Sequence, residues 1–459
     1  MIRSLAAIRC LATLLVLAPA LALAAPPEGK WQGPIVLGNS HLTMGLEVAK
    51  RPDGSFGAVL TSLDQGTPDQ VADRVTFTEG TLQADFTKSD TRIEGKFVDA
   101  HLKATYTQQK RAFNLTMKPV EAFATHARPQ EPKRPFSYTE EEVMVTVPGE
   151  KGAKEPVQLA GTLTLPAGKG PFPAVLLIGG TQPTDRDGWV ARHKPFLVLS
   201  DALTKAGIAT VRFDDRGIGK SGGASSTLAV HADDTLAELD FLAHHTKVDH
   251  KRIGIIARAE GSVVAAMVAA KSPEPRFLVF VAGVGVTGKQ QLAKQQDTLI
   301  HAVKLDESII KRSRAANDKL WALLEMESDD AKVREKLSAE MGGDSQMLAM
   351  ALQQISHGSV ALRDWLKSNP KPVLAKVRIP VLALGGDLDL QVDTPTNLAA
   401  IAAALKRGGN RHVTVEALPG LNHLMQHAKT GLPTEYLVIE ESFAPEALAK
   451  ISAFVLARH

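Results

Sequence analysis

The sequence has almost no cysteine: Cys10 is the only one in 459 residues. An internal disulfide framework is therefore excluded, and burial of apolar side chains has to hold the fold together. The sequence also lacks an H-E-x-x-H motif, and His244, His245 and His250 have no ligand spacing with carboxylates or cysteines. We predict no metal site and no cofactor.

Neither sign of charge dominates, with 53 lysines and arginines against 50 aspartates and glutamates. A net charge of +3 is too small to indicate nucleic-acid binding. The segment Gly217 to Gly222 matches G-x-G-x-x-G, but it runs into Gly-Ala-Ser-Ser instead of opening a helix. Asp214 also stands where a phosphate-binding loop needs glycine, so nucleotide binding is not expected.

Long hydrophobic runs are confined to the start of the chain. Arg3 and Arg9 precede the apolar run 11–25, which ends in small residues before two prolines. This pattern predicts a signal peptide over 1–25, cleaved near Ala24 or Ala25, and a periplasmic or secreted protein. We expect no membrane span, because this run is short and no second run of spanning length follows.

Residues 26–120 alternate between apolar and polar side chains with period two. Asp53-Gly54 and Glu79-Gly80 interrupt the alternation, which predicts antiparallel hairpins in a small β-barrel or sandwich. His41 and His101 stand alone on polar positions, and we interpret them as surface residues. Residues 121–137 have no periodicity and are predicted to be an interdomain linker.

Residues 138–459 follow a different pattern, in which short apolar runs alternate with helix-spaced segments. This alternation predicts an α/β domain with a mostly parallel sheet covered on both faces. The alternation stops at about 286–369, where charged helical segments intervene. A helical lid is the simplest interpretation, and a helical appendage that never touches the site is the alternative. The expected strands are 173–178, 208–213, 253–256, 277–281, 379–384 and 412–417.

The turn after the strand at 253–256 reads Ala257-Arg258-Ala259-Glu260-Gly261, and a helix of small residues follows it over 262–270. A strand, a tight turn and a helix are typical of the nucleophile turn G-x-S-x-G. Ala259 stands at the position of the serine and has no atom that can attack a carbonyl carbon. Ser262 lies inside the helix and is not expected to replace it.

Two further residues complete the pattern of a catalytic triad. Asp389 follows the strand at 379–384 after a glycine turn, and His423 lies in the loop after the last strand. A carboxylate after a late strand and then a histidine is the chain order of an α/β-hydrolase. The histidine could then accept a proton while Asp389 orients its ring. An ordinary solvated loop acid and loop histidine is the alternative interpretation.

At these residues the chain resembles secreted two-domain α/β-hydrolases of the acyl-esterase and serine-aminopeptidase-like type. The resemblance implies hydrolysis of carboxylic esters through an acyl-serine, in a pocket for a small acyl-ester or peptide-like ligand. It also implies oxyanion donors near Thr181, Gln182 and Glu260. The matching segments are 178–187, 213–222, 386–392, 418–430 and 435–443, together with the opening Trp31-Gln-Gly of the β module.

The departures from this group concern its reactive turn. The group's G-H-S becomes Ala257-Arg258-Ala259, and Gln182 stands where the group commonly has glycine. A laboratory knockout would usually change the serine alone, so the combined changes favour natural loss of the nucleophile.

Three functions follow from these departures. The first is a degenerate hydrolase that retains ligand binding. The second is slow hydrolysis by water that His423 and Asp389 activate. The third is an interaction scaffold whose lid and β module contact a partner protein, for which the sequence indicates no identity.

Overall fold

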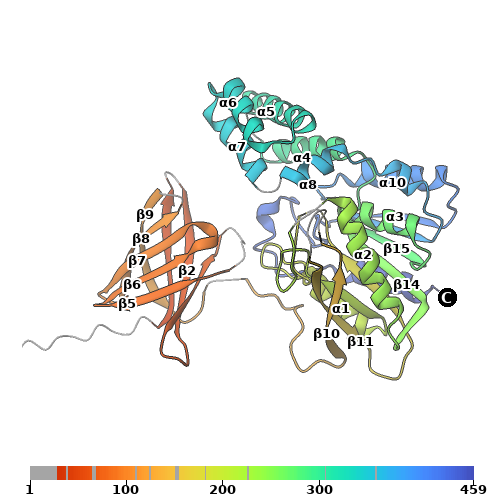
Figure 1. Cartoon of the computed structure of the whole chain (residues 1–459), viewed down its shortest axis with the longest axis horizontal. Coiled ribbons are helices and arrows are strands. Elements are labelled where there is room, and N and C mark those ends of the chain that lie inside the picture. The colour runs from red at the N-terminus through yellow and green to blue at the C-terminus, as the bar shows by residue number, and fades with distance from the viewer. Residues whose placement is uncertain are drawn as a thin grey trace, which may run out of the picture. The chain divides into compact units, whose positions relative to one another are not determined.

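The computed structural model describes residues 28–37, 40–64, 69–108, 111–123, 126–149, 155–180, 182–224, 227–304, 306–356 and 359–458. The predicted signal peptide lies outside these ranges. The chain divides into two compact units, 1–125 and 126–459 (Figure 1). Among the described helices, none is long and apolar enough to cross a membrane.

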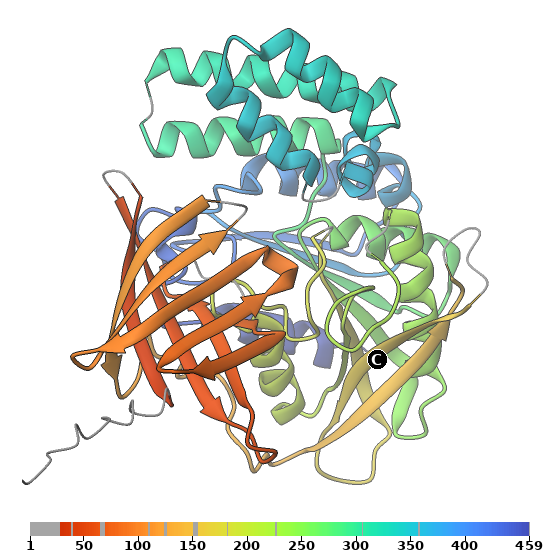
Figure 2. The same ribbon diagram turned by 60° about the vertical axis from the view of Figure 1, so that its left-hand side comes forward.

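The first unit is one continuous antiparallel sheet of nine strands, in the order β4-β3-β2-β1-β9-β8-β7-β6-β5. Figure 2 shows the sheet curving around its own interior. The predicted all-β domain is confirmed. The strands are β1 (Gly29–Leu37), β2 (Ser40–Lys50), β3 (Phe56–Ser62), β4 (Gln70–Val71), β5 (Arg74–Thr78), β6 (Thr81–Phe86), β7 (Thr91–Val98), β8 (His101–Gln108) and β9 (Arg111–Val120), with a 3-10 turn at Thr87–Ser89.

Period-two alternation explains the core of this unit. Alternate side chains of a strand face the same side of a sheet, so Leu46, Leu60 and Leu115 reach one apolar core from three different strands. The tight turns of the predicted hairpins contain Gly54 and Gly80, whose φ angles are +85° and +74°. Glycine adopts such angles without steric cost.

The second unit contains an eight-stranded sheet in the order β10-β11-β13-β12-β14-β15-β16-β17. The strands β12 to β17 pair in parallel, whereas β10 and β11 are antiparallel. The predicted mostly parallel sheet is therefore confirmed. The strands are β10 (Thr139–Val147), β11 (Val157–Leu165), β12 (Phe172–Ile178), β13 (Ala209–Phe213), β14 (Val248–Arg258), β15 (Phe277–Val281), β16 (Val381–Gly386) and β17 (Val413–Leu418).

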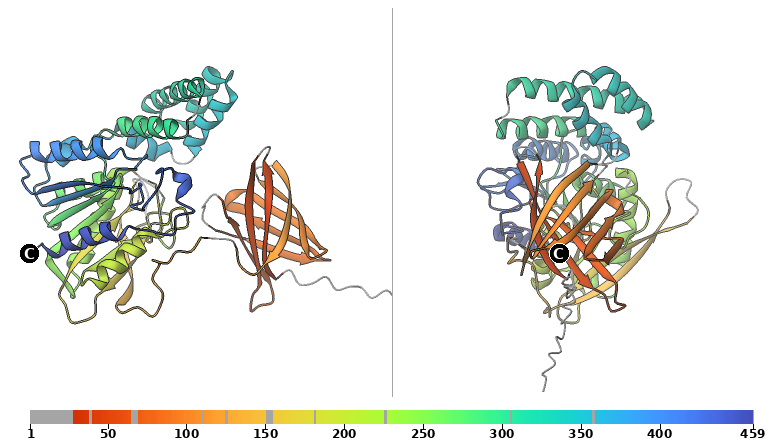
Figure 3. Two further views of the ribbon diagram at one scale, coloured as in Figure 1. Left: turned by 180° about the vertical axis from the view of Figure 1, so that it is seen from behind. Right: turned by 90° about the vertical axis from the view of Figure 1, so that its left-hand side faces the viewer.

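Helices cover both faces of this sheet, as Figure 3 shows. On one face α1 (Pro195–Lys205) and α11 (Pro445–Leu456) pack on one apolar cluster. On the other face α2 (Leu228–Ala243), α3 (Gly261–Lys271) and α10 (Thr394–Arg407) pack on a second cluster. Two buried faces explain why the strands are runs of Val, Ile and Leu without alternation.

Between β15 and β16 the chain forms a helical insertion with an apolar core of its own, which includes Leu320, Trp321 and Leu337. A separate core lets these helices pack on one another. The helices are α4 (Gly288–Ala302), α5 (Glu307–Met326), α6 (Asp330–Met341), α7 (Ser345–Ser356), α8 (Ser359–Lys367) and α9 (Lys371–Leu374).

Part of the predicted linker is bound to the second unit. Arg128 donates hydrogen bonds to the carbonyl oxygens of Leu437 and Ile439, at 2.9 and 3.0 Å. Gln130 donates to the carbonyl oxygen of Phe443 at 2.7 Å. These side-chain bonds to distant backbone groups leave no periodic signal in the sequence. Residues 126–137 therefore belong to the second unit in this structure.

Candidate active site

The turn between β14 and α3 has the backbone of a nucleophile elbow. Ala259 has a φ of +50°, a left-handed conformation that is uncommon for a residue with a side chain. Its N–H donates to the carbonyl oxygen of Val281 on the neighbouring strand β15 at 3.0 Å. A Cβ at Gly261 would overlap the carbonyl oxygen of Gly179, so only glycine fits where α3 begins. The elbow geometry is present although the serine is absent.

Ser262 does not supply the missing hydroxyl. Ser262 is fully buried, with 0% of its surface exposed. Its Oγ donates to the carbonyl oxygen of Ala259 at 2.7 Å and accepts from the N–H of Val284 at 2.9 Å. With both roles of the hydroxyl satisfied inside the protein, Ser262 is a structural residue.

Asp389 and His423 are brought together by the loops that follow β16 and β17. The Nδ1 of His423 lies 2.8 Å from Oδ2 of Asp389, whose side chain is completely buried. The other oxygen of Asp389 accepts from the N–H groups of Gln391 and Val392, both at 2.8 Å. The nearby Asp387 instead accepts from the N–H of Gly420. The geometry therefore favours Asp389 as the partner of the histidine.

A network of buried hydrogen bonds holds the loop that carries His423 in place. The side chain of Asn422 donates to Gln426 at 2.9 Å, and Gln426 reaches the Nε2 of His193 at 3.0 Å. His193 is fully buried and its Nδ1 lies 2.8 Å from Oγ of Ser442. Burial lowers the pKa of His193 to about 4, so this ring is neutral at pH 7. The sequence gives no signal for a role of this second histidine, because its partners lie far away along the chain.

The elbow and His423 border a cavity of about 590 Å³. This volume lies within the range of small-molecule sites. The helical insertion supplies one part of its wall, through Gln291, Trp365 and neighbouring residues. The lining residues are Gly179, Gly180, Gln182, Pro183, Thr184, Gly188, Trp189, Val190, Phe196, Arg258, Ala259, Glu260, Gln291, Leu292, Gln295, Gln354, Ala361, Leu362, Trp365, Gln391, Val392, His423 and Leu424.

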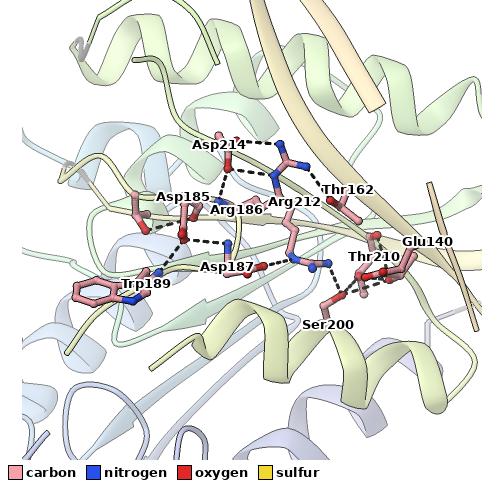
Figure 4. A network of polar contacts seen from close by, with 12 residues as sticks. Glu140, Thr162, Asp185, Arg186, Asp187, Trp189, Ser200, Thr210, Arg212 and Asp214 are labelled. Atoms are coloured by element: carbon pink, nitrogen blue, oxygen red, sulfur yellow. Dashed lines mark hydrogen bonds and ion pairs between the residues drawn. The ribbon is translucent and has the colours of Figure 1, made fainter. Parts of the chain in front are cut away.

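The loop after β12 carries Trp189 to the cavity, and Figure 4 shows the polar network that holds it. Asp185 accepts hydrogen bonds from the N–H groups of Asp187 and Trp189, at 3.1 and 3.0 Å. Arg186 pairs with the buried Asp214 at 2.8 Å. These contacts stabilise the loop after β12, which has little regular secondary structure.

Two of the three predicted oxyanion residues lie at the cavity. Thr181 lies outside the described residues, whereas Gln182 and Glu260 both line the cavity. Glu260 comes directly before α3, where the first N–H groups of a helix have no intrahelical acceptor. An anionic oxygen above Ala259 would therefore meet the positive end of α3.

Arg258 also lines the cavity, and its Nε is buried without a hydrogen-bond partner among the described residues. Burial lowers the pKa of its guanidinium, while Tyr436, Asp389 and Glu260 act in the opposite direction. In the sequence, Arg258 differs from the histidine that the related hydrolases have before the serine, and nothing more could be predicted for it. The residue type gave no signal that the Nε of this guanidinium would find no hydrogen-bond partner among the described residues.

The other histidines named from the sequence do not form a site. His244 lies next to Asp240, and the Nε2 of His245 lies 3.5 Å from Glu141. In the ranges that the structure describes, no three His, Cys, Asp or Glu side chains gather at metal-binding distances.

The sheet, its covering helices, the elbow and the Asp389–His423 pair together define an α/β-hydrolase. Residues 153–417 match the model of the X-Pro dipeptidyl-peptidase family S15. The chain belongs to this family, and the predicted relationship to acyl-esterase-like α/β-hydrolases with a β module is confirmed.

Individual relatives are more distant. A curated esterase of Thermotoga maritima is 40% identical over 58 residues, and the chain spans only 14% of that protein. A solved esterase of Pyrococcus furiosus is 16% identical, with a TM-score of 0.43 over 73% of this chain and 98% of that one. A hypothetical protein of Pseudomonas aeruginosa is 14% identical, with a TM-score of 0.45 over 74% of this chain and 100% of that one.

Proposed function

We propose that this protein is an exported member of the hydrolase family that binds a small ligand and does not form an acyl-enzyme. The observation that carries the proposal is Ala259 at the left-handed elbow beside the cavity. Loss of a triad serine costs about a millionfold in turnover. Export is part of the proposal and is supported by the charged and apolar pattern of residues 1–25.

A second candidate function is slow hydrolysis by an activated water molecule. His423 favours it, because Asp389 holds its Nδ1 while the residue itself borders the cavity. The Nε2 could then take a proton from water as that water attacks a bound ester. No bond between protein and substrate forms on this route.

Hydrolysis of short-chain p-nitrophenyl esters by the purified protein tests both candidates, with a fluorophosphonate probe as the reporter of a nucleophilic serine. Release of p-nitrophenol at the buffer rate, without labelling, supports the binding protein. Hydrolysis that disappears in His423→Ala without labelling supports the water route. Hydrolysis that persists in His423→Ala rejects that route, and labelling of the parent protein overturns the main proposal.

A further inference from the structure

Two donor groups in the cavity wall lack an acceptor. The Nε of Arg258 and the indole Nε1 of Trp365 are buried without a hydrogen-bond partner among the described residues. Trp365 is only 3% exposed. Arginine and tryptophan side chains donate hydrogen bonds and accept none, so only an acceptor atom could pair with these two nitrogens. Neither atom has exposed surface, so the polar group that the wall offers to a ligand is the guanidinium of Arg258 as a whole.

The guanidinium of Arg258 also forms no ion pair within the described residues, although Asp389 and Glu260 lie near enough to favour its charge. Within the described part of the chain no carboxylate lies within ion-pair distance of it, which is 4.0 Å. Asp389 is already engaged by His423 and two backbone N–H groups. Glu260 lines the same cavity, and its carboxylate packs against Gly180. Tyr436 carries no charge at pH 7, since a phenol is neutral there already and burial raises its pKa further, to about 12.

Some of the amide side chains in the wall remain available. Gln291, Gln354 and Gln391 each make side-chain hydrogen bonds within the protein. Gln182 and Gln295 also line the cavity, and no side-chain hydrogen bond of theirs is found within the described residues. Free amides beside aromatic and aliphatic walls such as Trp189 and Leu292 suit a ligand with both amide groups and apolar parts.

We propose that the cavity binds a peptide-like carboxylate whose anionic group pairs with the guanidinium of Arg258. This deepens the ligand-binding role proposed above and rests on it. The ligand class is the acid that hydrolysis of an ester or amide would release, and not an ester. Arginine suits this role because its planar fork matches the two oxygens of a carboxylate. The positive end of α3, beside Ala259, favours the same anion.

The test compares N-acetyl-L-alanyl-L-alanine with the same dipeptide as its C-terminal carboxamide. The two probes differ only in charge at one end. Titration calorimetry at pH 7 and low salt measures the Kd of each probe for the full protein. Arg258→Gln removes the charge, Arg258→Lys keeps it, and Arg312→Gln removes an exposed arginine that pairs with Asp344 outside the cavity.

We expect the acid to bind the parent at least about tenfold more tightly than the carboxamide. Arg258→Gln should abolish this preference, Arg258→Lys should keep part of it, and Arg312→Gln should leave it unchanged. Equal Kd values in the parent, an undiminished preference in Arg258→Gln, or no binding of either probe at millimolar concentration would overturn the inference. The comparison within the parent needs no variant to fold. Failure here is distinct from failure of the proposed function, which the ester assay reports.

Discussion

The Oγ of Ser262 donates to the carbonyl oxygen of Ala259 at 2.7 Å, so the hydroxyl nearest along the chain is directed into the protein. Its bond from the N–H of Val284 completes this arrangement. The helix that carries the elbow is thus stabilised by a serine three residues beyond the position where a nucleophile would stand. The elbow therefore keeps its local structure without a hydroxyl at position 259. The effect of placing a hydroxyl there can be tested by mutation.

Restoring the hydroxyl at the elbow should restore turnover. Ala259→Ser places an Oγ on a backbone whose φ is already +50°, beside the Asp389–His423 pair. We expect hydrolysis of p-nitrophenyl butyrate to rise by at least about a thousandfold over the parent, since a triad serine is worth about a millionfold. Addition of His423→Ala should remove the gain. Silence of Ala259→Ser, also when combined with Arg258→His, would mean that the site has decayed beyond the elbow.

The two aspartates after β16 should behave differently in the Ala259→Ser background. Asp389→Asn takes the carboxylate from His423 and should lower the restored kcat toward that of the parent, since loss of a triad acid costs up to about ten-thousandfold. Asp387→Asn is the matched control, because Asp387 contacts the N–H of Gly420 and not the histidine. Its kcat should stay within a few-fold of the restored value. Equal losses in the two variants would contradict the assignment of Asp389.

Gly261 should tolerate no side chain, although it opens a helix. A Cβ there overlaps the carbonyl oxygen of Gly179, and relieving such an overlap typically costs about 1–3 kcal/mol. We expect Gly261→Ala to lower the free energy of unfolding by that amount in urea denaturation. At Gly343 a Cβ would meet no described atom within 4 Å, so Gly343→Ala should be nearly neutral. The prediction fails if the two variants unfold at the same urea concentration.

His193 should make stability depend on pH. Its pKa is about 4 in the folded protein against 6.5 for an ordinary histidine, so the unfolded chain takes up the proton first as the pH falls. The stabilisation is complete above pH 6.5 and is lost as the pH falls toward 4, by up to about 3 kcal/mol. His193→Gln cannot titrate there. Its free energy of unfolding should therefore fall less than that of the parent over this range, and equal slopes would contradict the prediction.

The sequence predicted much of the fold because the relevant patterns are local. Alternation with period two indicated the antiparallel first unit, and the change to strand and helix segments indicated the parallel sheet. Chain order was enough to choose Asp389 and His423, since loops at the carboxyl ends of parallel strands meet at one edge of the sheet. That alanine stands at position 259, where the motif has serine, was likewise evident from residue type alone.

Distances and charge balance could not be predicted in this way. His193 meets Ser442 across 249 positions of sequence, and the wall formed by Trp365 comes from an insertion far from the elbow. In the sequence, Arg258 is only one substitution within the reactive-turn motif. Only the packing of distant loops shows that its guanidinium forms no ion pair among the residues that the structure describes.

The residue types and their order along the chain thus determined that this protein contains an α/β-hydrolase fold, with alanine at the position that the motif gives to serine, because periodicity and motif order are properties of short segments. Only the tertiary structure shows that the elbow and His423 border one cavity of about 590 Å³. Burial, pairing and cavity shape arise from segments that meet only when the chain is folded, so no short segment of the sequence contains them.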